Sequence, residues 1–321
     1  MDNKKICAVI VTFNRKELLK RCIDAVINQT YKPDELFIID NASTDGTPDY
    51  LFQESAIGSV PSSEETLTDV STDKMKIRYY RLSSNQGGAG GFHQGLKLAH
   101  EAGRFDGFWL MDDDGYPSKD CLKRQIPYLD KYDYVMPLSI DIDNHENLSW
   151  ATRKKDGVKT IKVDELRTEW GELMPFIFPF NGSLLSRKIV DKVGYINPKL
   201  FIWGDDYEHY YRCLKAGFNP VTILDAEFYH PVNKAPTVKA FFGLVDVPFV
   251  ESPLRFVCLI RNWAYINKTN HRYLSLCKTF AAYTWLFLIT RRFDLKNYRL
   301  FLASFFDGLR EKFDRHKKYL K

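Results

Sequence analysis

Hydrophobic and polar positions follow two different periods along the first 137 residues. Short apolar runs predict buried strands, and between them apolar residues recur every three or four positions, as on one face of a helix. The predicted strands are 6–13, 36–39, 76–82, 105–111 and 134–137, and the predicted helices are 16–29, one that starts at 43–45, and 93–102. Strands separated by helices predict an α/β fold with a mostly parallel sheet, right-handed crossovers and flanking helices.

The pattern weakens after residue 137. Residues 138–174 are typical of polar hairpins, and helical stretches follow at 253–266, 273–289 and 296–313. Residues 54–73, rich in Ser, Thr, Asp and Glu, predict a mobile surface loop. We therefore predict one domain over 1–250, with a first half over about 1–137 and a second over about 138–250, and a helical C-terminal region over 251–321.

Charge and cysteine content limit the cellular compartments in which we expect this protein. The net charge is +5, and the chain from Arg291 onward carries ten Lys/Arg against four Asp/Glu, so the excess lies in an aromatic C-terminal region. The six cysteines form no C-x-x-C pair, which predicts a reduced, cytoplasmic protein. The apolar start predicts a strand and no signal peptide, and the longest apolar run, 280–290, is too short to span a membrane.

Polar features follow four of the predicted strands. Thr12-Phe13-Asn14 follows the first, Asp40-Asn41 the second, the segment 85–91 (NQGGAGG) the third, and Asp112-Asp113-Asp114 the fourth. In open α/β sheets ligands bind at the carboxyl ends of the strands. The sequence therefore predicts a ligand site at this edge.

The triple aspartate indicates a metal site. Adjacent carboxylates repel one another unless a cation offsets their charge, and in an extended turn Asp112 and Asp114 point to the same side. Hard oxygen ligands favour Mg²⁺ or Mn²⁺, which keep positions open for phosphate oxygens. The alternative is a solvated acidic turn that caps a helix.

The glycine-rich segment is a weak signal by itself. Glycines let a ligand approach the backbone, which would place Asn85, Gly87 and Gly88 against a bound donor. The alternative is a flexible bend that permits close packing. The segment follows the third strand, so it is not a dinucleotide fingerprint in its usual place.

A second acidic cluster begins the helix predicted after FIWG. Asp205, Asp206 and Glu208 lie near that helix N-terminus, where carboxylates are also common as capping residues. A carboxylate that faces a metal-bound diphosphate can act as general base for a hydroxyl. His230 could complete the metal shell, although a lone histidine is more often structural.

Together these motifs carry a resemblance. VIVTFNR, IIDNASTDGT, NQGGAGGF, WLMDDDGYP and FIWGDDYEHYYR stand in the order seen in family 2 glycosyltransferases with the GT-A fold, a Rossmann-like fold that binds nucleotide-diphospho-sugars. They span about residues 5–230, and the pairing of NQGGAGGF with WLMDDD most resembles the bacterial galactofuranosyltransferases. The resemblance implies an inverting transfer from UDP-galactofuranose to a glycan or lipid-linked acceptor in cell-surface polysaccharide synthesis. Rhamnosyltransferases and other hexosyltransferases of the family are the alternative.

The resemblance also implies residue roles in the donor half. Asp40 would hold the nucleobase, with Thr12 and Asn14 in the same pocket. Asp112 and Asp114 match the metal motif for Mn²⁺ or Mg²⁺, with Asp114 the direct ligand. Because there are three aspartates, the register at Asp113 stays open, and Asp113 is counted with the donor-binding residues.

In the acceptor half, the resemblance implies that Asp206 is the catalytic base, with Asp205 as the alternate. His230, a little over twenty residues further on, matches a metal ligand. Trp203 and Glu208 would line the acceptor site.

The C-terminal region is compatible with three roles. A basic, aromatic, amphipathic helix is typical of peripheral contact with an anionic membrane surface. An ordinary helical subdomain or a dimer contact would also account for this composition. For the whole chain, a nucleotidyltransferase and a non-catalytic glycan-binding protein are more distant candidates. Nucleic acid is not an expected partner, because the predicted nucleotide pocket is acidic and lies away from the basic region.

Overall fold

The computed structural model describes residues 4–54, 64–175, 180–232 and 236–320. The chain forms two compact units: Met1–Pro198 with His209–Asn233, and Lys199–Glu208 with Lys234–Lys321. The units therefore part near residue 234, and a short internal segment groups with the C-terminal one. The predicted division into 1–250 and 251–321 separates regions by function and not by compactness, and it stays a prediction.

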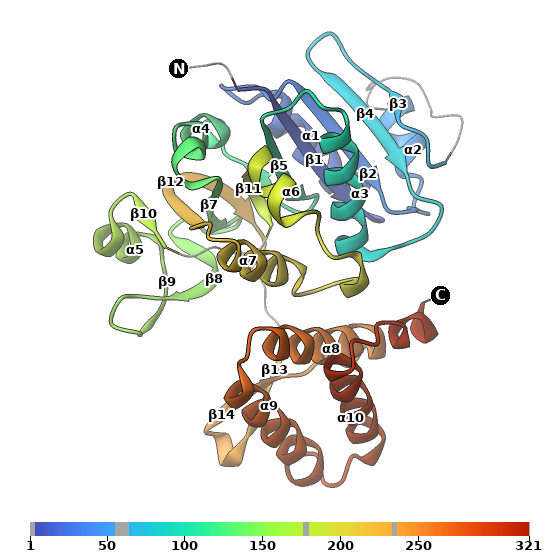
Figure 1. The fold of residues 1–321 in the computed structure, drawn as a ribbon, viewed down its shortest axis with the longest axis vertical. Coiled ribbons are helices and arrows are strands. Elements are labelled where there is room, and N and C mark those ends of the chain that lie inside the picture. Colours follow the sequence, from blue (N-terminus) through green and yellow to red (C-terminus); the bar gives the residue numbers. More distant parts are fainter. Residues whose placement is uncertain (1–3, 55–63, 176–179, 233–235, 321) are drawn as a thin grey trace. The chain divides into compact units, whose positions relative to one another are not determined.

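A single mixed sheet forms the centre of the first unit (Figure 1). Its main path runs β10-β12-β7-β11-β5-β1-β2-β4-β3, and the pairs β1–β2, β1–β5, β2–β4 and β7–β12 are parallel. The strands are β1 Ile6–Thr12, β2 Glu35–Asp40, β3 Thr68–Asp69, β4 Lys76–Arg81, β5 Gly107–Asp112, β6 Tyr116–Pro117, β7 Tyr134–Asp141, β8 Asn147–Arg153, β9 Lys159–Lys162, β10 Leu173–Met174, β11 Asn181–Ser186 and β12 Val221–His230. The predicted α/β fold with a mostly parallel sheet is confirmed.

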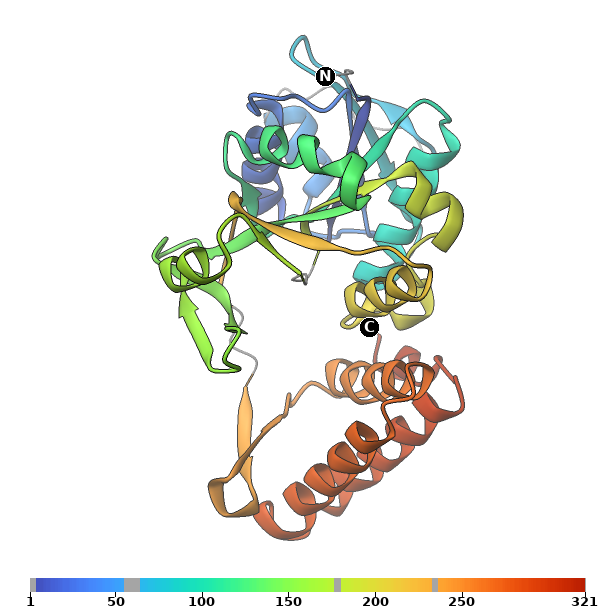
Figure 2. The same ribbon diagram turned by 60° about the vertical axis from the view of Figure 1, so that its left-hand side comes forward.

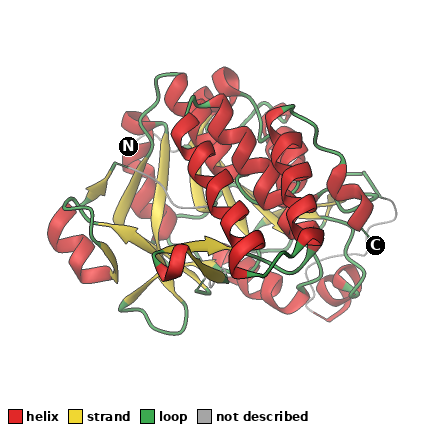
Figure 3. Cartoon of the chain, turned by 90° about the horizontal axis from the view of Figure 1, so that it is seen from below, coloured by secondary structure: helices red, strands yellow, loops and turns green. Residues whose placement is uncertain are grey.

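Helices connect the strands of this sheet, and Figure 3 draws helices in red and strands in yellow. The helices are α1 Lys16–Ile27, α2 Thr47–Asp49, η1 Tyr50–Glu54, α3 Gly87–Glu101, α4 Cys121–Tyr132, α5 Val163–Trp170, α6 Arg187–Val193, η2 Pro198–Leu200 and α7 Asp205–Lys215. Side chains of β1 alternate between two cores, as the period of a strand requires. Ile10 packs with residues of α1 and α4, whereas Val9 and Val11 pack with residues of α3 and α6.

Helix α3 begins at Gly87, six residues before the predicted start at His93. The helix includes the glycines because, without side chains, they let it lie directly on β1. A Cβ atom at Gly91 would stand 2.4 Å from Val11 Cγ1, and one at Gly95 would stand 2.5 Å from Val9 Cγ1. Close packing, which the sequence left as an alternative, thus occurs within a helix instead of a bend.

The second half of this unit holds the predicted hairpin and two helices, α5 and α6, that the sequence pattern did not predict. Strands β8 and β9 pair antiparallel, and α5 follows directly at Val163. Strand β7 runs four residues beyond its predicted end, to Asp141, because it pairs with β12 along its length. Of the predicted mobile loop 54–73, residues 55–63 lie outside the described ranges, and β3 lies within the remainder.

The second unit is a hairpin with a bundle of helices (Figure 2). Its elements are β13 Thr237–Ala240, η3 Phe241–Gly243, β14 Val245–Pro248, α8 Pro253–Thr269, α9 Tyr273–Trp285, η4 Leu286–Thr290, α10 Leu295–Leu309 and η5 Arg315–Tyr319. The three predicted C-terminal helices are confirmed within a few residues. In the described ranges, no helix combines the length and the apolar character that crossing a membrane requires.

Candidate active site

Strand ends bring predicted site residues to one edge of the sheet. Thr12 ends β1, Asp40 ends β2, Asp112 ends β5 and His230 ends β12. Thr12 pairs in register with Asp40, and Val11 with Asp112. The chain winds from β1 through β2 to β4 on one side, and β5 lies on the other side of β1. This reversal is a topological switch point, where open α/β sheets form ligand crevices.

The structure distinguishes the three aspartates. Asp113 is 2% exposed, and its carboxylate accepts hydrogen bonds from Thr12 Oγ1 (2.6 Å) and Arg15 Nη1 (2.9 Å). Burial raises the pKa of Asp113 to about 6, against the opposing effects of Arg15 and Thr12. Asp113 therefore ties β1 to β5 beneath the surface of the site, whereas Asp112 and Asp114 are only partly buried.

Asp114 is paired on one oxygen and open on the other. Its Oδ2 accepts a hydrogen bond from Arg15 Nη1 at 2.8 Å. Its Oδ1 is buried and has no aligned hydrogen bond within the described structure, although His230 Nε2 lies 3.1 Å away. Burial acts to raise the pKa of Asp114, but the contact with His230 and the charge of Arg15 hold it below its usual value.

His230 reaches Asp114 because β6 pairs antiparallel with β12, with Tyr116 opposite Tyr229. Its Nδ1 lies 2.6 Å from the carbonyl oxygen of Pro231, to which it donates as Nδ1–H. In the neutral ring this leaves the lone pair of Nε2 facing Asp114 Oδ1. Two acceptors at 3.1 Å repel each other unless a proton or a cation lies between them.

This arrangement fits a divalent cation. Neighbouring octahedral ligands at about 2.1 Å from an ion are about 3 Å apart, similar to the Asp114–His230 separation. In the described part of the chain, no three His, Cys, Asp or Glu side chains converge as a complete cage. Mg²⁺ and Mn²⁺ need no such cage, because substrate phosphates and water supply their other ligands. Asp114 and His230 could hold the ion, and Asp112 lies two residues before Asp114, at the end of β5.

Asp40 is fully buried at the neighbouring strand end. Its Oδ1 accepts a hydrogen bond from the backbone of Ser43 (2.8 Å), and its Oδ2 accepts one from Tyr79. Arg81 Nε lies 3.7 Å from the same carboxylate. Asp40 therefore holds the turn after β2, and a nucleobase could contact it only after a shift of the side chains that bury it.

The other predicted donor residues join the loops at this edge. Asn14 Oδ1 accepts a hydrogen bond from the backbone of Thr44 (2.6 Å), which links the turns after β1 and β2. Asn85 Oδ1 accepts one from Asn41 Nδ2 (3.1 Å) and one from the backbone of Gly87 (2.8 Å). Gly87 has a positive φ of 71°, and a Cβ atom at Gly88 would meet open space. A donor group could therefore approach this part of the backbone.

Trp203, Asp205, Asp206 and Glu208 belong to the second compact unit. The backbone before the acidic pair is strained, because Phe201 and Trp203 both have positive φ angles, 67° and 66°. Burial and the neighbouring carboxylates of Asp206 and Glu208 raise the pKa of Asp205, and burial raises that of Asp206. Both carboxyls of the pair therefore hold a proton to higher pH than an exposed aspartate does.

Two residues that the motifs did not indicate hold this strained turn. Asn262 of α8 is fully buried, and its Nδ2 donates to the carbonyl oxygens of Leu200 (2.9 Å), Ile202 (2.9 Å) and Trp203 (2.8 Å). The buried Arg261 also donates to the Leu200 carbonyl, at 2.8 Å. No local pattern around 261–262 points to this role. Arg15 was missed too, although its place directly after Asn14 was a usable signal.

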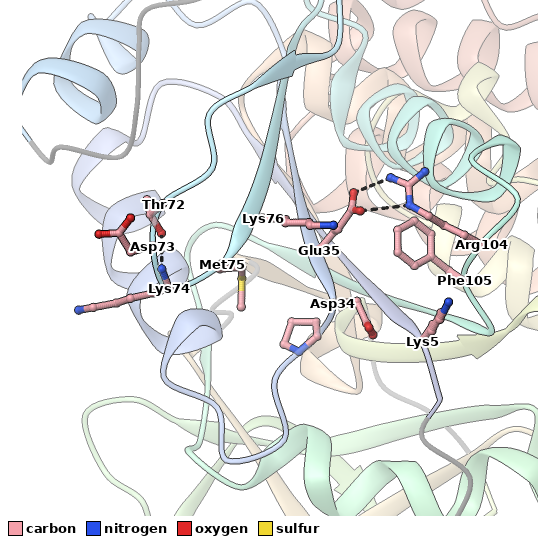
Figure 4. Close-up of a pocket in the computed structure, with 11 residues that line it drawn as sticks. Lys5, Asp34, Glu35, Thr72, Asp73, Lys74, Met75, Lys76, Arg104 and Phe105 are labelled. Atoms are coloured by element: carbon pink, nitrogen blue, oxygen red, sulfur yellow. Dashed lines mark hydrogen bonds and ion pairs between the residues drawn. The ribbon is translucent and has the colours of Figure 1, made fainter.

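A charged hollow of about 460 Å³ lies at the opposite edge of the sheet (Figure 4). Residues at the amino ends of the strands line it, among them Lys5, Glu35 and Lys76. Arg104 donates to both oxygens of the buried Glu35, at 3.1 and 2.6 Å. None of the predicted site residues lines this hollow.

Comparisons with known proteins agree with this geometry. The model of glycosyl transferase family 2 matches residues 7–194. Galactofuranosyltransferase GlfT1 of Mycolicibacterium smegmatis is 30% identical over 318 residues, which cover 97% of this chain and 98% of that protein. The dTDP-rhamnosyl transferase RfbF of Shigella flexneri is 24% identical over 316 residues, 96% of each chain.

Solved structures share the fold. The mannosyltransferase PcManGT of Pyrobaculum calidifontis, in complex with GDP-Man and Mn²⁺, has a TM-score of 0.52 at 15% identity over 84% of this chain and 64% of that one. TarS 1-349 of S. aureus has a TM-score of 0.51 at 13% identity over 97% and 82%. The fold is GT-A, as the sequence predicted. With a family model that covers more than half of its residues, this chain belongs to glycosyltransferase family 2 and is a glycosyltransferase.

Proposed function

We propose that this protein is a metal-dependent, inverting glycosyltransferase that transfers galactofuranose from UDP-galactofuranose to a glycan or lipid-linked glycan. The observation that carries the proposal is the Asp114–His230 pair at the switch point, with a buried carboxylate oxygen left open at 3.1 Å from an imidazole nitrogen. The donor rests on the 30% identity to a galactofuranosyltransferase over nearly the whole of both chains.

In this proposal, Asp114 and His230 hold Mn²⁺ or Mg²⁺, and Asp112 contributes to the same site. A bound divalent cation offsets the charge that develops on the departing diphosphate. Arg15 orients the aspartate turn, since its guanidinium donates to the carboxylates of both Asp113 and Asp114, and Thr12 also donates to Asp113. The Mn²⁺ in the PcManGT complex supports the choice of ion class.

The transfer itself needs a base. Asp206 takes the proton of the acceptor hydroxyl, whose oxygen forms a bond to C1 of the sugar. The bond between C1 and the diphosphate oxygen breaks on the opposite face, UDP leaves with the electron pair, and the configuration at C1 inverts. Asp206 is given this role as the second member of the acidic pair, the position that the family resemblance implies, and its raised pKa suits a group that accepts a proton. Trp203 and Glu208 line the acceptor side, and Asp40, Thr12, Asn14, Asn85, Gly87 and Gly88 the donor side.

A rhamnosyltransferase is the second candidate, because the similarity to RfbF also extends over nearly the whole chain, at 24% identity. The nucleotidyltransferase and glycan-binding candidates receive no support from the comparisons. The cytoplasmic location and a peripheral contact of the basic, aromatic C-terminal region with the inner membrane face are part of the proposal.

A donor screen tests the proposal directly. Release of nucleoside diphosphate is measured with UDP-galactofuranose, dTDP-rhamnose and UDP-hexoses, with Mn²⁺ or Mg²⁺ and with a chelator. We expect turnover of UDP-galactofuranose that disappears with the chelator. Turnover of dTDP-rhamnose alone would reject the donor and keep the reaction class. Turnover that persists in the chelator would reject the metal site.

A further inference from the structure

The tip of the β13–β14 hairpin exposes large apolar side chains. Phe242 is 90% exposed and Leu244 is 86% exposed. Phe242 also has a φ of 56°, in a region that bulky residues rarely adopt. A left-handed backbone conformation at a phenylalanine costs free energy, and so does the exposure of its apolar side chain to water. The contacts within the unit offset neither cost.

The turn between η4 and α10 repeats the same features. Phe293 is 68% exposed and has a φ of 62°, and Leu295, at the start of α10, is 50% exposed. Ile289 in η4 is exposed as well. Two separate turns therefore present large apolar side chains, and in each a phenylalanine adopts a left-handed backbone conformation.

The two turns belong to one end of the second unit. Trp285, the last residue of α9, stacks on Phe241 with ring centroids 4.7 Å apart and meets Phe242 edge-on at 5.2 Å. Arg291 lies over the ring of Phe249, just after β14, at 4.6 Å. Figures 1 and 2 both show the hairpin tip and the turn after α9 at the lower end of this unit. We call this surface, formed by Phe242, Leu244, Ile289, Phe293 and Leu295, the apolar end.

Unpaired positive charge lies on one side of the apolar end, around the Phe293 turn and the start of α10. Two acidic residues nearby are already paired, Asp246 with Lys239 at 2.9 Å and Asp294 with Arg291 at 2.9 Å. Arg292, Lys296 and Arg299 are exposed and make no ion pair with any residue in the described ranges. Three unpaired cations therefore lie within a few residues of the exposed Phe293 and Leu295.

We propose that the apolar end docks on an anionic lipid bilayer, with the hairpin tip and the Phe293 turn inserted among the headgroups. Apolar side chains at the tips of turns, with unpaired Lys and Arg beside one of them, match the boundary between acyl chains and anionic headgroups. A second copy of this chain is disfavoured, because a two-fold contact would bring the same unpaired cations against each other. This proposal specifies which surface makes the peripheral membrane contact proposed above, and it rests on that proposed contact.

Vesicle binding by the full chain tests the proposal. Flotation is measured with phosphatidylcholine vesicles and with vesicles that also contain phosphatidylglycerol. We expect binding to the anionic vesicles that weakens as salt increases, because exposed charges are screened. Two double variants, F242S/L244S and F293S/L295S, should each lower the fraction bound about tenfold. R292E/K296E should abolish the preference for anionic lipid.

Matched controls come from the same unit. Y273S/L274S removes two exposed apolar side chains, 59% and 70% exposed, at the other end of α9, and K312E/K318E removes two cations away from the apolar end. Both control variants should bind as wild type does. All variants should retain donor turnover with a water-soluble acceptor, so failure of the docking surface is distinguishable from failure of the proposed function.

Three outcomes would overturn the proposal. The first is wild-type protein that does not float with anionic vesicles while it turns over donor. The second is loss of binding in Y273S/L274S equal to that in F242S/L244S, which would indicate nonspecific adsorption. The third is a dimer in light scattering that F242S/L244S converts to a monomer, which would assign the apolar end to a second copy.

Discussion

Each edge of the sheet in the first unit holds an arginine paired with a carboxylate, but the two edges differ in how many carboxylate oxygens are hydrogen-bonded. At the amino edge, Arg104 donates two hydrogen bonds to the buried Glu35, so both carboxylate oxygens are satisfied. At the carboxyl edge, one nitrogen of Arg15 is shared between Asp113 and Asp114, and Asp114 Oδ1 is left open beside His230. A saturated ion pair stabilises the fold, whereas a buried oxygen without an aligned donor is ready for a ligand.

The largest expected difference between the edges comes from one matched pair of carboxylate-to-amide substitutions. Asp114→Asn should lower turnover on the order of a thousandfold, because it removes a negative oxygen from the proposed cation site. Glu35→Gln should leave turnover unchanged and lower the free energy of unfolding by about 2 kcal/mol. Rates of UDP release and chemical denaturation measure the two effects. Equal loss of turnover in both variants would contradict the comparison.

A second pair of variants tests the strained turn that presents the acidic pair. Asn262→Leu removes the donor to three carbonyl oxygens, so we expect turnover to fall about tenfold to a hundredfold with little change in KM for the donor. Asn267→Leu on the same helix removes one bond, to the carbonyl of Trp263, and serves as the control. A kcat for Asn262→Leu equal to that of the control would show that Asn262 does not position the turn.

The two arginines allow a third comparison. Arg15→Gln should lower turnover about tenfold, since Asp114 loses its orienting donor, and should change the affinity for Mn²⁺ measured without substrate. Arg104→Gln should leave both quantities at the wild-type level. If Arg15→Gln and Arg104→Gln give the same turnover and the same affinity for Mn²⁺, the role of Arg15 is structural only.

The smallest expected effect is a shift in pH dependence. Burial raises the pKa of Asp206, so a reaction that needs its ionised form should lose rate on acidification while the pH is still well above the usual aspartate value near 4. Asp205→Asn leaves the burial of Asp206 in place, so the acid limb of kcat/KM should stay at the wild-type pH. Asp206→Asn should lose turnover together with this limb. A limb that disappears in Asp205→Asn, with turnover kept in Asp206→Asn, would assign the base to Asp205.

Most of the strands at the site were predictable from the sequence, because each is a local apolar run. Strands β1, β2, β4 and β5 begin and end within a few residues of their predicted bounds, so the motifs at their ends fall on the expected edge. The start of α3 was not predictable in this way. Glycine has a low intrinsic preference for helices, and only the close approach to Val9 and Val11 explains a helical run of glycines.

The different environments of the three aspartates could also not be predicted without the fold. In sequence, the period of an extended turn groups Asp112 with Asp114 but leaves the register at Asp113 open. In the structure, Thr12 and Arg15 bury Asp113, and the pairing of β6 with β12 brings His230 to Asp114. The roles assigned to these residues in catalysis stay predictions that the variants above test.

The sequence by itself determined the fold class, the family and the strand ends at which polar residues gather. These properties depend on periodicity and on short motifs, which are local in the chain. The tertiary structure alone decided which oxygen of Asp114 stays open, how Asn262 holds a turn about sixty residues away, and that two separate turns expose apolar side chains at one end of a unit. Each of these depends on segments far apart in sequence, and their contacts are set by packing and strand pairing that no local pattern encodes.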